Sequence, residues 1–217
     1  MFAIAPDGGK IWYDHTPGER TVLLVHGFAS DSARTWGATG WPRALGGHGV
    51  LAVDLRGHGH SQAHRPPDGF TPENLADDLL AVLAAAGVAE ADVITYSMGG
   101  LAGWALARRA PGRVRRLVLG GLGARPASAA DMAGVARELG ATGLEAIAED
   151  MAGHRIEGPA PVPALLAAGD ADTLAPDAAE LAAALGAPFV PLPNRNHFNA
   201  LSSRAFKQAA LEFLEAK

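Results

Sequence analysis

Short, nearly continuous apolar segments recur along this chain, and most of them end in a glycine-containing or polar turn. An unbroken run of β-branched and aliphatic residues such as Thr21–Val25 is typical of a strand covered on both faces, as in a parallel sheet. The predicted strands are Thr21–Val25, Val50–Asp54, Ala91–Thr95, Arg116–Leu119, Val162–Ala168 and Phe189–Val190. Helical segments alternate with them, so the sequence predicts an α/β fold with a mostly parallel central sheet flanked by helices. In such a fold, reactive residues gather beyond the carboxyl ends of the strands.

The sequence also predicts an N-terminal hairpin and the first residues of two helices. Phe2–Ala5 and Lys10–His15 flank a Gly-rich turn, which predicts a β-hairpin. Thr71 is the expected N-cap of a helix that begins at Pro72, and Ser202 or Ser203 is the expected cap of the last helix.

One stretch, at about 126–161, contains no convincing strand. Two short helical patterns lie in it, Met132–Leu139 and Leu144–Ile147. We therefore expect a single domain over 1–217, with a core made of 1–125 and 162–217 and a small helical cap inserted at about 126–161.

Composition excludes several classes of partner and site. The 217 residues carry a formal net charge of −5, which does not favour binding to nucleic acids. The chain has no cysteine, so it can form neither a disulfide nor a thiolate site. The N-terminal residues lack a secretory pattern, and the longest apolar run, Leu79–Ala89, is too short to span a membrane. These features predict a cytoplasmic protein without membrane or nucleic-acid partners.

A serine follows the strand Ala91–Thr95 and precedes a helical segment, within the sequence Thr95-Tyr-Ser-Met-Gly-Gly100. A serine on such a strand-to-helix turn projects from the sheet and needs small residues two positions away on either side. This resembles the nucleophile elbow, G-x-S-x-G, of the α/β-hydrolase superfamily, and implies that Ser97 is a nucleophile. Thr95 departs from the family's glycine. The alternative is that Ser97 is only a helix cap.

Two more segments resemble the same superfamily. His26-Gly27-Phe28 follows a predicted strand, as in the family's oxyanion loop, and implies an oxyanion hole made by the backbone N–H groups of Phe28 and Met98. Asp54-Leu-Arg-Gly-His-Gly-His-Ser61 resembles a turn that is mainly structural in the family. Its histidines, His58 and His60 with His64 nearby, could instead form a metal cluster, although the glycines favour a loop.

A hydroxyl nucleophile needs a base, and histidine suits this role near neutral pH. His197 lies between the last predicted strand and helix, at the family's histidine position. Two aspartates compete for the acid that orients it. The family pattern G-x-x-D selects Asp172, and Asp170 is the alternative. The remaining histidines His15, His48 and His154 have no motif around them and are expected at the surface.

The resemblance implies a serine hydrolase of carboxylic esters that needs no cofactor and no metal, and the apolar residues expected around the serine favour small to medium acyl groups. The expected triad is Ser97, Asp172 and His197, and the expected lining of the pocket is Phe28, Tyr96, Met98 and Phe198, with Met132 or Met151 as further candidates. Two alternatives stay open: a hydrolase of carbon–carbon bonds with the same triad, and a ligand-binding protein without catalysis. The sequence leaves the oligomeric state unknown. A serine nucleophile argues against the dehalogenase and epoxide hydrolase branches of the superfamily, which carry aspartate at that position.

Overall fold

A computed structural model describes residues 1–62 and 69–216, and an eight-stranded sheet forms its centre. The strand order is β1-β2-β4-β3-β5-β6-β7-β8. The antiparallel pairs are β1 with β2 and β2 with β4, whereas all pairs from β4 to β8 are parallel. The strands are β1 (Phe2–Ile4), β2 (Lys10–Thr16), β3 (Thr21–Val25), β4 (Gly49–Val53), β5 (Ala91–Tyr96), β6 (Val114–Gly120), β7 (Ala164–Gly169) and β8 (Phe189–Leu192). The predicted hairpin and mostly parallel sheet are confirmed.

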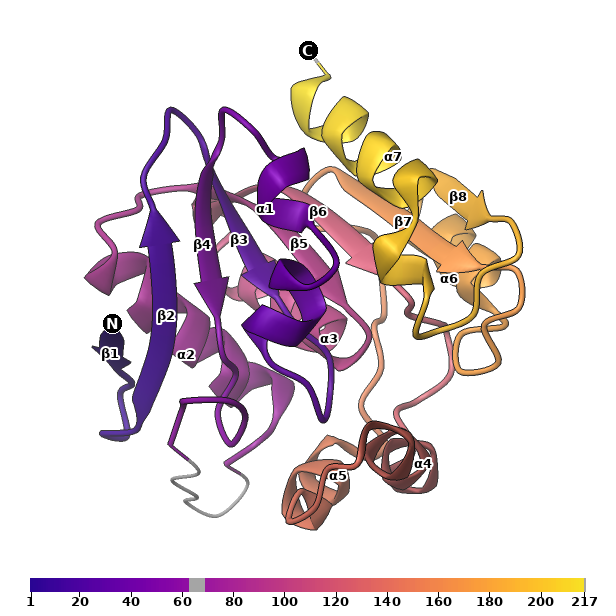
Figure 1. Cartoon of the computed structure of the whole chain (residues 1–217), viewed down its shortest axis with the longest axis horizontal. Helices are drawn as coiled ribbons and strands as arrows, with labels where there is room; N and C mark the ends of the chain where they lie inside the picture. Colours follow the sequence, from indigo (N-terminus) through magenta and orange to yellow (C-terminus); the bar gives the residue numbers. More distant parts are fainter. Residues whose placement is uncertain (63–68, 217) are drawn as a thin grey trace.

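Helices cover both faces of this sheet (Figure 1). The α-helices of the described residues are α1 (Trp41–Ala44), α2 (Pro72–Ala85), α3 (Met98–Arg109), α4 (Ala129–Leu139), α5 (Glu145–Met151), α6 (Ala178–Leu185) and α7 (Arg204–Glu215). Shorter helical turns are η1 (Ala33–Gly37), η2 (Pro111–Arg113) and η3 (Ala200–Ser202). One buried cluster packs α2, α3 and α6 on one face, and the other packs α1 and α7 on the opposite face. The sequence pattern did not reveal η1, α1 or α6, because they are short or rich in alanine.

Helix caps fall where the side chains predicted them. The Thr71 hydroxyl accepts a hydrogen bond from the Asn74 amide at the start of α2, and Ser203 does the same for Phe206 at the start of α7. Ser203, rather than Ser202, is therefore the cap of α7.

The helices α4 and α5 lie beyond the carboxyl ends of the parallel strands, away from the two helical layers (Figure 1). Long connections from β6 and to β7 carry them there. This pair belongs to the segment that the sequence set apart as an insertion. Met151 is fully buried within it and does not line the cavities below, so it is core rather than lining.

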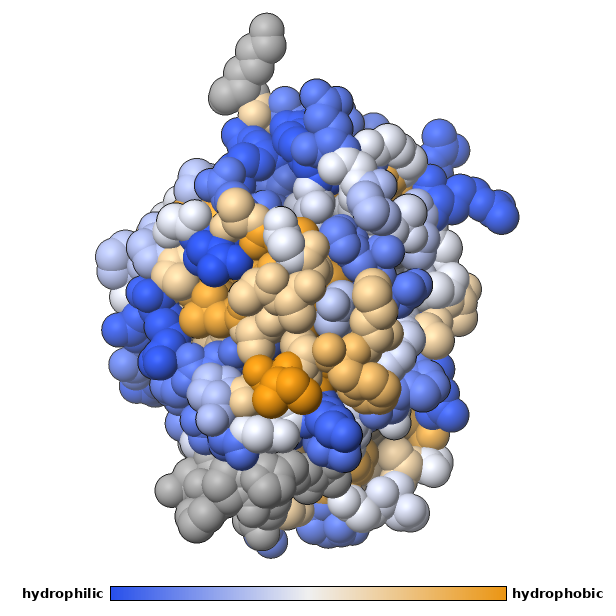
Figure 2. All heavy atoms as spheres, turned by 90° about the vertical axis from the view of Figure 1, so that its left-hand side faces the viewer, coloured by the Kyte–Doolittle hydropathy of each residue, from blue (hydrophilic) through white to orange (hydrophobic). Residues whose placement is uncertain are grey.

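The sheet ends at β1, whose outward side chains are apolar. Phe2 and Ile4 are 53% and 60% exposed, while Ala3 between them is buried. Figure 2 shows apolar side chains gathered on the face of the molecule that carries this edge. Among the described residues, no helix is long and apolar enough to cross a membrane.

Candidate active site

Ser97 occupies a strained turn between β5 and α3. Its φ of 50° and ψ of −125° lie in a region that residues with a side chain rarely adopt. A Cβ at Gly99 would lie 2.3 Å from the carbonyl oxygen of His26, so the close packing of α3 against the end of β3 requires glycine there. This is the local geometry expected of a nucleophile elbow.

Thr95 replaces the usual glycine of the elbow without disturbing it. Its hydroxyl donates a hydrogen bond of 3.0 Å to the carbonyl oxygen of Val118 in β6. A Cβ at Gly103 in α3 would lie 2.5 Å from the Thr95 methyl group. In the family pattern, the small residue that allows this close approach is a glycine of the strand. Here the small residue is Gly103 of the helix, and the strand carries Thr95.

His197 and Asp172 meet at the carboxyl edge of the sheet. The Nδ1 atom of His197 lies 2.9 Å from Oδ2 and 3.1 Å from Oδ1 of Asp172, and both side chains are buried. Oδ1 also accepts hydrogen bonds from the amides of Leu174 and Ala175, which fix the carboxylate. Asp170 is exposed, so Asp172 is the aspartate that the structure places at His197.

Phe28 and Met98, the residues expected to form an oxyanion hole, line the same hollow as Ser97. Over residues 1–62 and 69–216, the amides of Phe28 and Met98 donate to no protein acceptor, although both residues are buried. Met98 is the first residue of α3, where the helix itself leaves an N–H group free and adds a positive partial charge. Buried, unsatisfied N–H groups are rare in proteins, so these two amides are available to an acceptor that the described residues do not provide.

Two hollows adjoin Ser97, and His197 lines both. The larger has a volume of about 400 Å³ and extends past Met98 to Met132 in α4. The smaller has a volume of about 180 Å³ and is lined by Tyr96 and Phe198, while Phe28 borders both. All four residues expected to contact substrate therefore line one of the two hollows. Within the described residues, no hydrogen bond joins the Ser97 hydroxyl to His197. In the absence of substrate, hydrogen bonds between catalytic groups are often long or poorly aligned.

The loop after β3 is held by two histidines that the sequence did not single out for this role. The Nε2 atom of His58 accepts from the Ala29 amide at 3.1 Å, and its Nδ1 donates to the Arg56 carbonyl oxygen at 3.0 Å. His26 accepts from the Leu55 amide and donates to the Gly27 carbonyl oxygen in the same manner. Both rings must be neutral to accept these bonds. Burial, followed by the neighbouring His26, lowers the pKa of His58 to about 3, and burial also lowers the pKa of His26.

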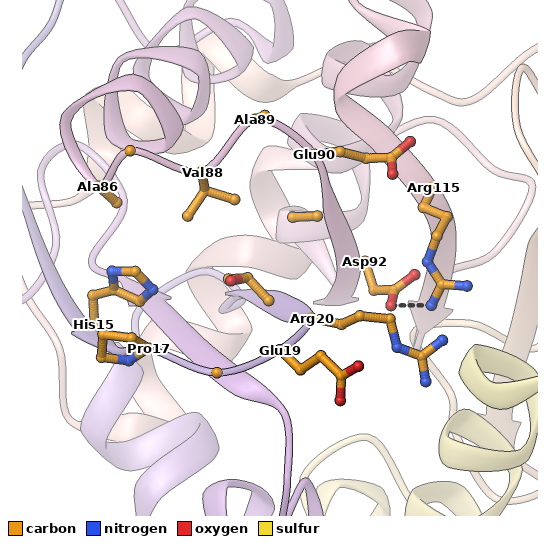
Figure 3. A pocket seen from close by; sticks show the side chains of 14 residues that line it. His15, Pro17, Glu19, Arg20, Ala86, Val88, Ala89, Glu90, Asp92 and Arg115 are labelled. Carbon is orange, nitrogen blue, oxygen red and sulfur yellow. Dashed lines mark hydrogen bonds and ion pairs between the residues drawn. The ribbon is translucent and has the colours of Figure 1, made fainter.

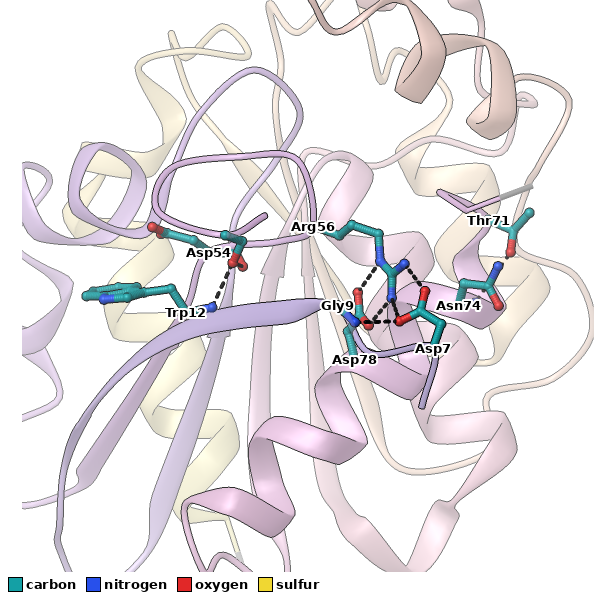
Figure 4. Close-up of polar contacts among 9 residues, drawn as sticks. Asp7, Gly9, Trp12, Asp54, Arg56, Thr71, Asn74 and Asp78 are labelled. Atoms are coloured by element: carbon teal, nitrogen blue, oxygen red, sulfur yellow. Dashed lines mark hydrogen bonds and ion pairs between the residues drawn. The ribbon is translucent and has the colours of Figure 1, made fainter. Parts of the chain in front are cut away.

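Hydrogen bonds and ion pairs of Asp54 and Arg56 hold the turn that follows β4. The buried Arg56 guanidinium binds the carboxylates of Asp78 in α2 and Asp7 before β2 (Figure 4). Asp54 accepts hydrogen bonds from the amides of Ser32 and His60; burial opposes its charge, but these bonds prevail and lower the pKa of Asp54. The turn therefore serves the structure, as expected.

The alternative of a metal cluster in this turn has no support in the described residues. There, no group of histidine, aspartate or glutamate side chains could hold a metal ion. His58 uses both ring nitrogens in hydrogen bonds to the backbone. His64 lies outside the described residues.

A hollow larger than these two lies elsewhere in the described residues. It has a volume of about 640 Å³ and is found at the amino ends of β3, β5 and β6, opposite the end that carries Ser97 (Figure 3). Its charged wall includes the buried Asp92, which pairs with Arg115. Among the described residues that line it, none is a serine, and His15 is the one histidine.

Three histidines expected at the surface are partly buried, which corrects that prediction. His15 lines the hollow at the amino ends, and His48 lines a groove beside η1. His154 lines the larger hollow at Ser97, together with Arg125 and Asp131. No pattern in the sequence marks His154 as a residue of this hollow, because its place depends on how an irregular part of the segment 126–161 folds.

Comparison with known proteins agrees with this geometry. Residues 20–150 match the model of the alpha/beta hydrolase fold family. Over 109 residues, which are 49% of this chain and 38% of the relative, the sequence is 38% identical to a 2-hydroxymuconate semialdehyde hydrolase of Pseudomonas putida. Over 108 residues, 47% of this chain and 38% of the relative, it is 33% identical to a putative carbamate hydrolase RutD of Caulobacter segnis. The matches span 38% of the length of these curated relatives.

Solved structures are similar over nearly the whole chain. The enol-lactonase of Burkholderia xenovorans LB400 superimposes with a TM-score of 0.81 at 27% sequence identity, covering 99% of this chain and 99% of that structure. The sheet order, the strained serine turn and the family match lead to one conclusion: the chain belongs to the alpha/beta hydrolase fold family.

Proposed function

We propose that this protein is a serine hydrolase that cleaves carboxylic esters of small to medium acyl groups through an acyl-enzyme. The observation that carries the proposal is the convergence of Ser97, His197 and the free amides of Phe28 and Met98 on one hollow of about 400 Å³. A nucleophile, a base and two donors for an oxyanion are the groups that acyl transfer requires.

In the proposed mechanism, His197 Nε2 accepts the proton of the Ser97 hydroxyl while the oxygen attacks the ester carbonyl carbon. The oxygen of the tetrahedral intermediate accepts hydrogen bonds from the amides of Phe28 and Met98. His197 then gives its proton to the departing alcohol, and the acyl group stays on Ser97. Water, deprotonated by His197, attacks the carbonyl carbon of the acyl-enzyme. As the bond from that carbon to Oγ of Ser97 breaks and the carboxylic acid leaves, His197 returns the proton to the Ser97 oxygen. Asp172 holds the Nδ1 proton and stabilises the imidazolium throughout.

The size and the lining of the hollows support small to medium acyl groups. The smaller hollow, of about 180 Å³, is lined largely by apolar groups such as Tyr96, Phe198 and Leu201. The lining of the larger hollow includes polar residues, among them Arg125 and His154. We expect the acyl chain in the smaller hollow and the more polar part of the substrate in the larger.

The test is hydrolysis of p-nitrophenyl esters of increasing acyl length by the wild type and by Ser97→Ala. We expect turnover of the shorter esters and its loss in Ser97→Ala. A wild type that hydrolyses none of them would overturn the ester assignment.

A second candidate is hydrolysis of a carbon–carbon bond beside a carbonyl group. The similarity to a 2-hydroxymuconate semialdehyde hydrolase favours it, and the same residues would serve. A β-diketone panel assayed beside the esters distinguishes the two: the preferred class is the one with the higher kcat/KM.

A further inference from the structure

The residue before the nucleophile contacts the residue proposed as its base. Tyr96 is the last residue of β5 and is 3% exposed. Its hydroxyl donates a hydrogen bond of 2.5 Å to the backbone carbonyl oxygen of His197, 101 positions further along the chain. The two rings lie 5.3 Å apart. One side chain therefore connects the turn that carries Ser97 with the loop that carries His197.

The end of β6 leaves room for this ring. A Cβ at Gly120 would lie 2.8 Å from Cδ2 of Tyr96, and a Cβ at Gly121 would lie 2.7 Å from its Cζ and 2.9 Å from its hydroxyl oxygen. On another side, the ring of Phe206 in α7 lies 6.4 Å away. Burial raises the pKa of Tyr96, so the hydroxyl keeps the proton that it donates. The ring is thus held between the end of β6 and α7, with the smaller hollow beside it.

His197 needs a second point of attachment. Asp172 holds Nδ1 of the imidazole. The loop between β8 and η3 is anchored beside His197 by the carbonyl oxygens of Arg195 and Asn196, which accept from the amides of Ala171 and Ala200, but neither of these bonds reaches His197 itself. Rotation about the Asp172 contact would move Nε2 relative to Ser97. The bond from Tyr96 fixes the backbone end of the same residue, and Tyr96 is covalently joined to Ser97.

We propose that Tyr96 is a positioning residue that sets the distance between the His197 imidazole and the Ser97 hydroxyl. Its effect on turnover rests on the proposed function, whereas its effect on the geometry of His197 does not. Proton transfer depends steeply on donor–acceptor geometry, so a loosened base lowers kcat more than it changes KM.

The test is Tyr96→Phe, which keeps the ring and removes only the hydroxyl. We expect kcat per active site, counted by fluorophosphonate titration, to fall about tenfold with KM within about twofold. The second readout is the low-field proton NMR resonance of His197 Nδ1–H, identified by its loss in His197→Ala. We expect this resonance to broaden in Tyr96→Phe because the imidazole becomes mobile.

The matched control is Ser202→Ala. The Ser202 hydroxyl also donates to a carbonyl oxygen of this loop, that of Asn199, at 2.9 Å, but it contacts neither His197 nor Ser97. We expect kcat and the proton resonance of Ser202→Ala to match the wild type. A Tyr96→Phe protein with the resonance of the wild type would overturn the proposal, whatever its activity. If the wild type hydrolyses no ester, the proposed function fails, and the resonance alone decides the role of Tyr96.

Discussion

At the scale of single residues, the turn that carries Ser97 depends on how Thr95 of β5 packs against Gly103 of α3. Thr95 fills the space that a glycine would leave open, and Gly103 in α3 makes room for its methyl group. The sequence showed the departure at Thr95 but not its compensation, because Gly103 reads as an ordinary helical glycine. Only the packing of α3 on β5 brings the two residues together.

Gly103→Ala tests this pairing. The new methyl group would meet the Thr95 methyl group in a buried contact, so we expect a loss of about 1–3 kcal/mol in the free energy of unfolding. The matched control is Gly134→Ala in α4, where a Cβ meets only the end of the Arg137 side chain at 3.7 Å; helix propensity then predicts a gain of up to about 1 kcal/mol. Urea denaturation measures both. Adding Thr95→Ser to Gly103→Ala removes the methyl group and keeps the hydroxyl that donates to the Val118 carbonyl oxygen, so it should restore most of the loss; an unrestored loss would show that the Thr95 methyl group is not the obstacle.

Asp172→Asn tests the orientation of the base. The Asn oxygen would keep the amide hydrogen bonds of Leu174 and Ala175, so its NH₂ group would face Nδ1 of His197. This moves the imidazole proton to Nε2, where it blocks proton transfer from Ser97. We expect kcat to fall at least about tenfold without loss of folding. Asp170→Asn is the control and should keep full activity; the reverse pattern would make Asp170 the acid.

At the scale of elements, the loops after β3 and β4 form one unit. His58 and His26 join the two loops through backbone hydrogen bonds, and Arg56 joins the second loop to α2. The amide of Phe28 lies on this unit, so the shape of the site depends on histidines that stay neutral. The sequence marked both loops through their motifs, but their mutual hydrogen bonds arise only when β3 and β4 pair.

The pH dependence of stability follows from the buried His58. Its pKa is about 3 in the folded protein and about 6.5 in an unfolded chain, so between these values only the unfolded chain binds a proton there. The free energy of unfolding therefore falls as the pH drops below about 6.5, by about 1.4 kcal/mol per pH unit down to about pH 3. Denaturation at pH 7.5 and pH 5 measures this loss. His58→Gln, which does not titrate, should lose less over the same interval; an equal loss would assign the effect to other groups.

At the scale of the whole molecule, the sequence predicted the sheet and the residues gathered at its carboxyl edge. Six parallel strands were visible because most of them contain a buried aliphatic run that ends in a turn; β8 is the exception, since Phe189 is half-buried and Pro191 is exposed. Helix α6 was missed because alanine suits either face of a helix and hides its period. The polar wall of the larger hollow, with Arg125 and His154, was also missed, because it depends on how the insertion folds back over the edge.

The central claim is that Ser97 is an activated nucleophile, and covalent labelling tests it most directly. The folded protein would be incubated with a fluorophosphonate, and the modified peptide identified by mass spectrometry. We predict one adduct per chain, located on Ser97, absent from Ser97→Ala and formed much more slowly in His197→Ala. A folded wild type that remains unlabelled, or that carries its adduct on another residue, would contradict the account and favour a ligand-binding protein built on the same fold.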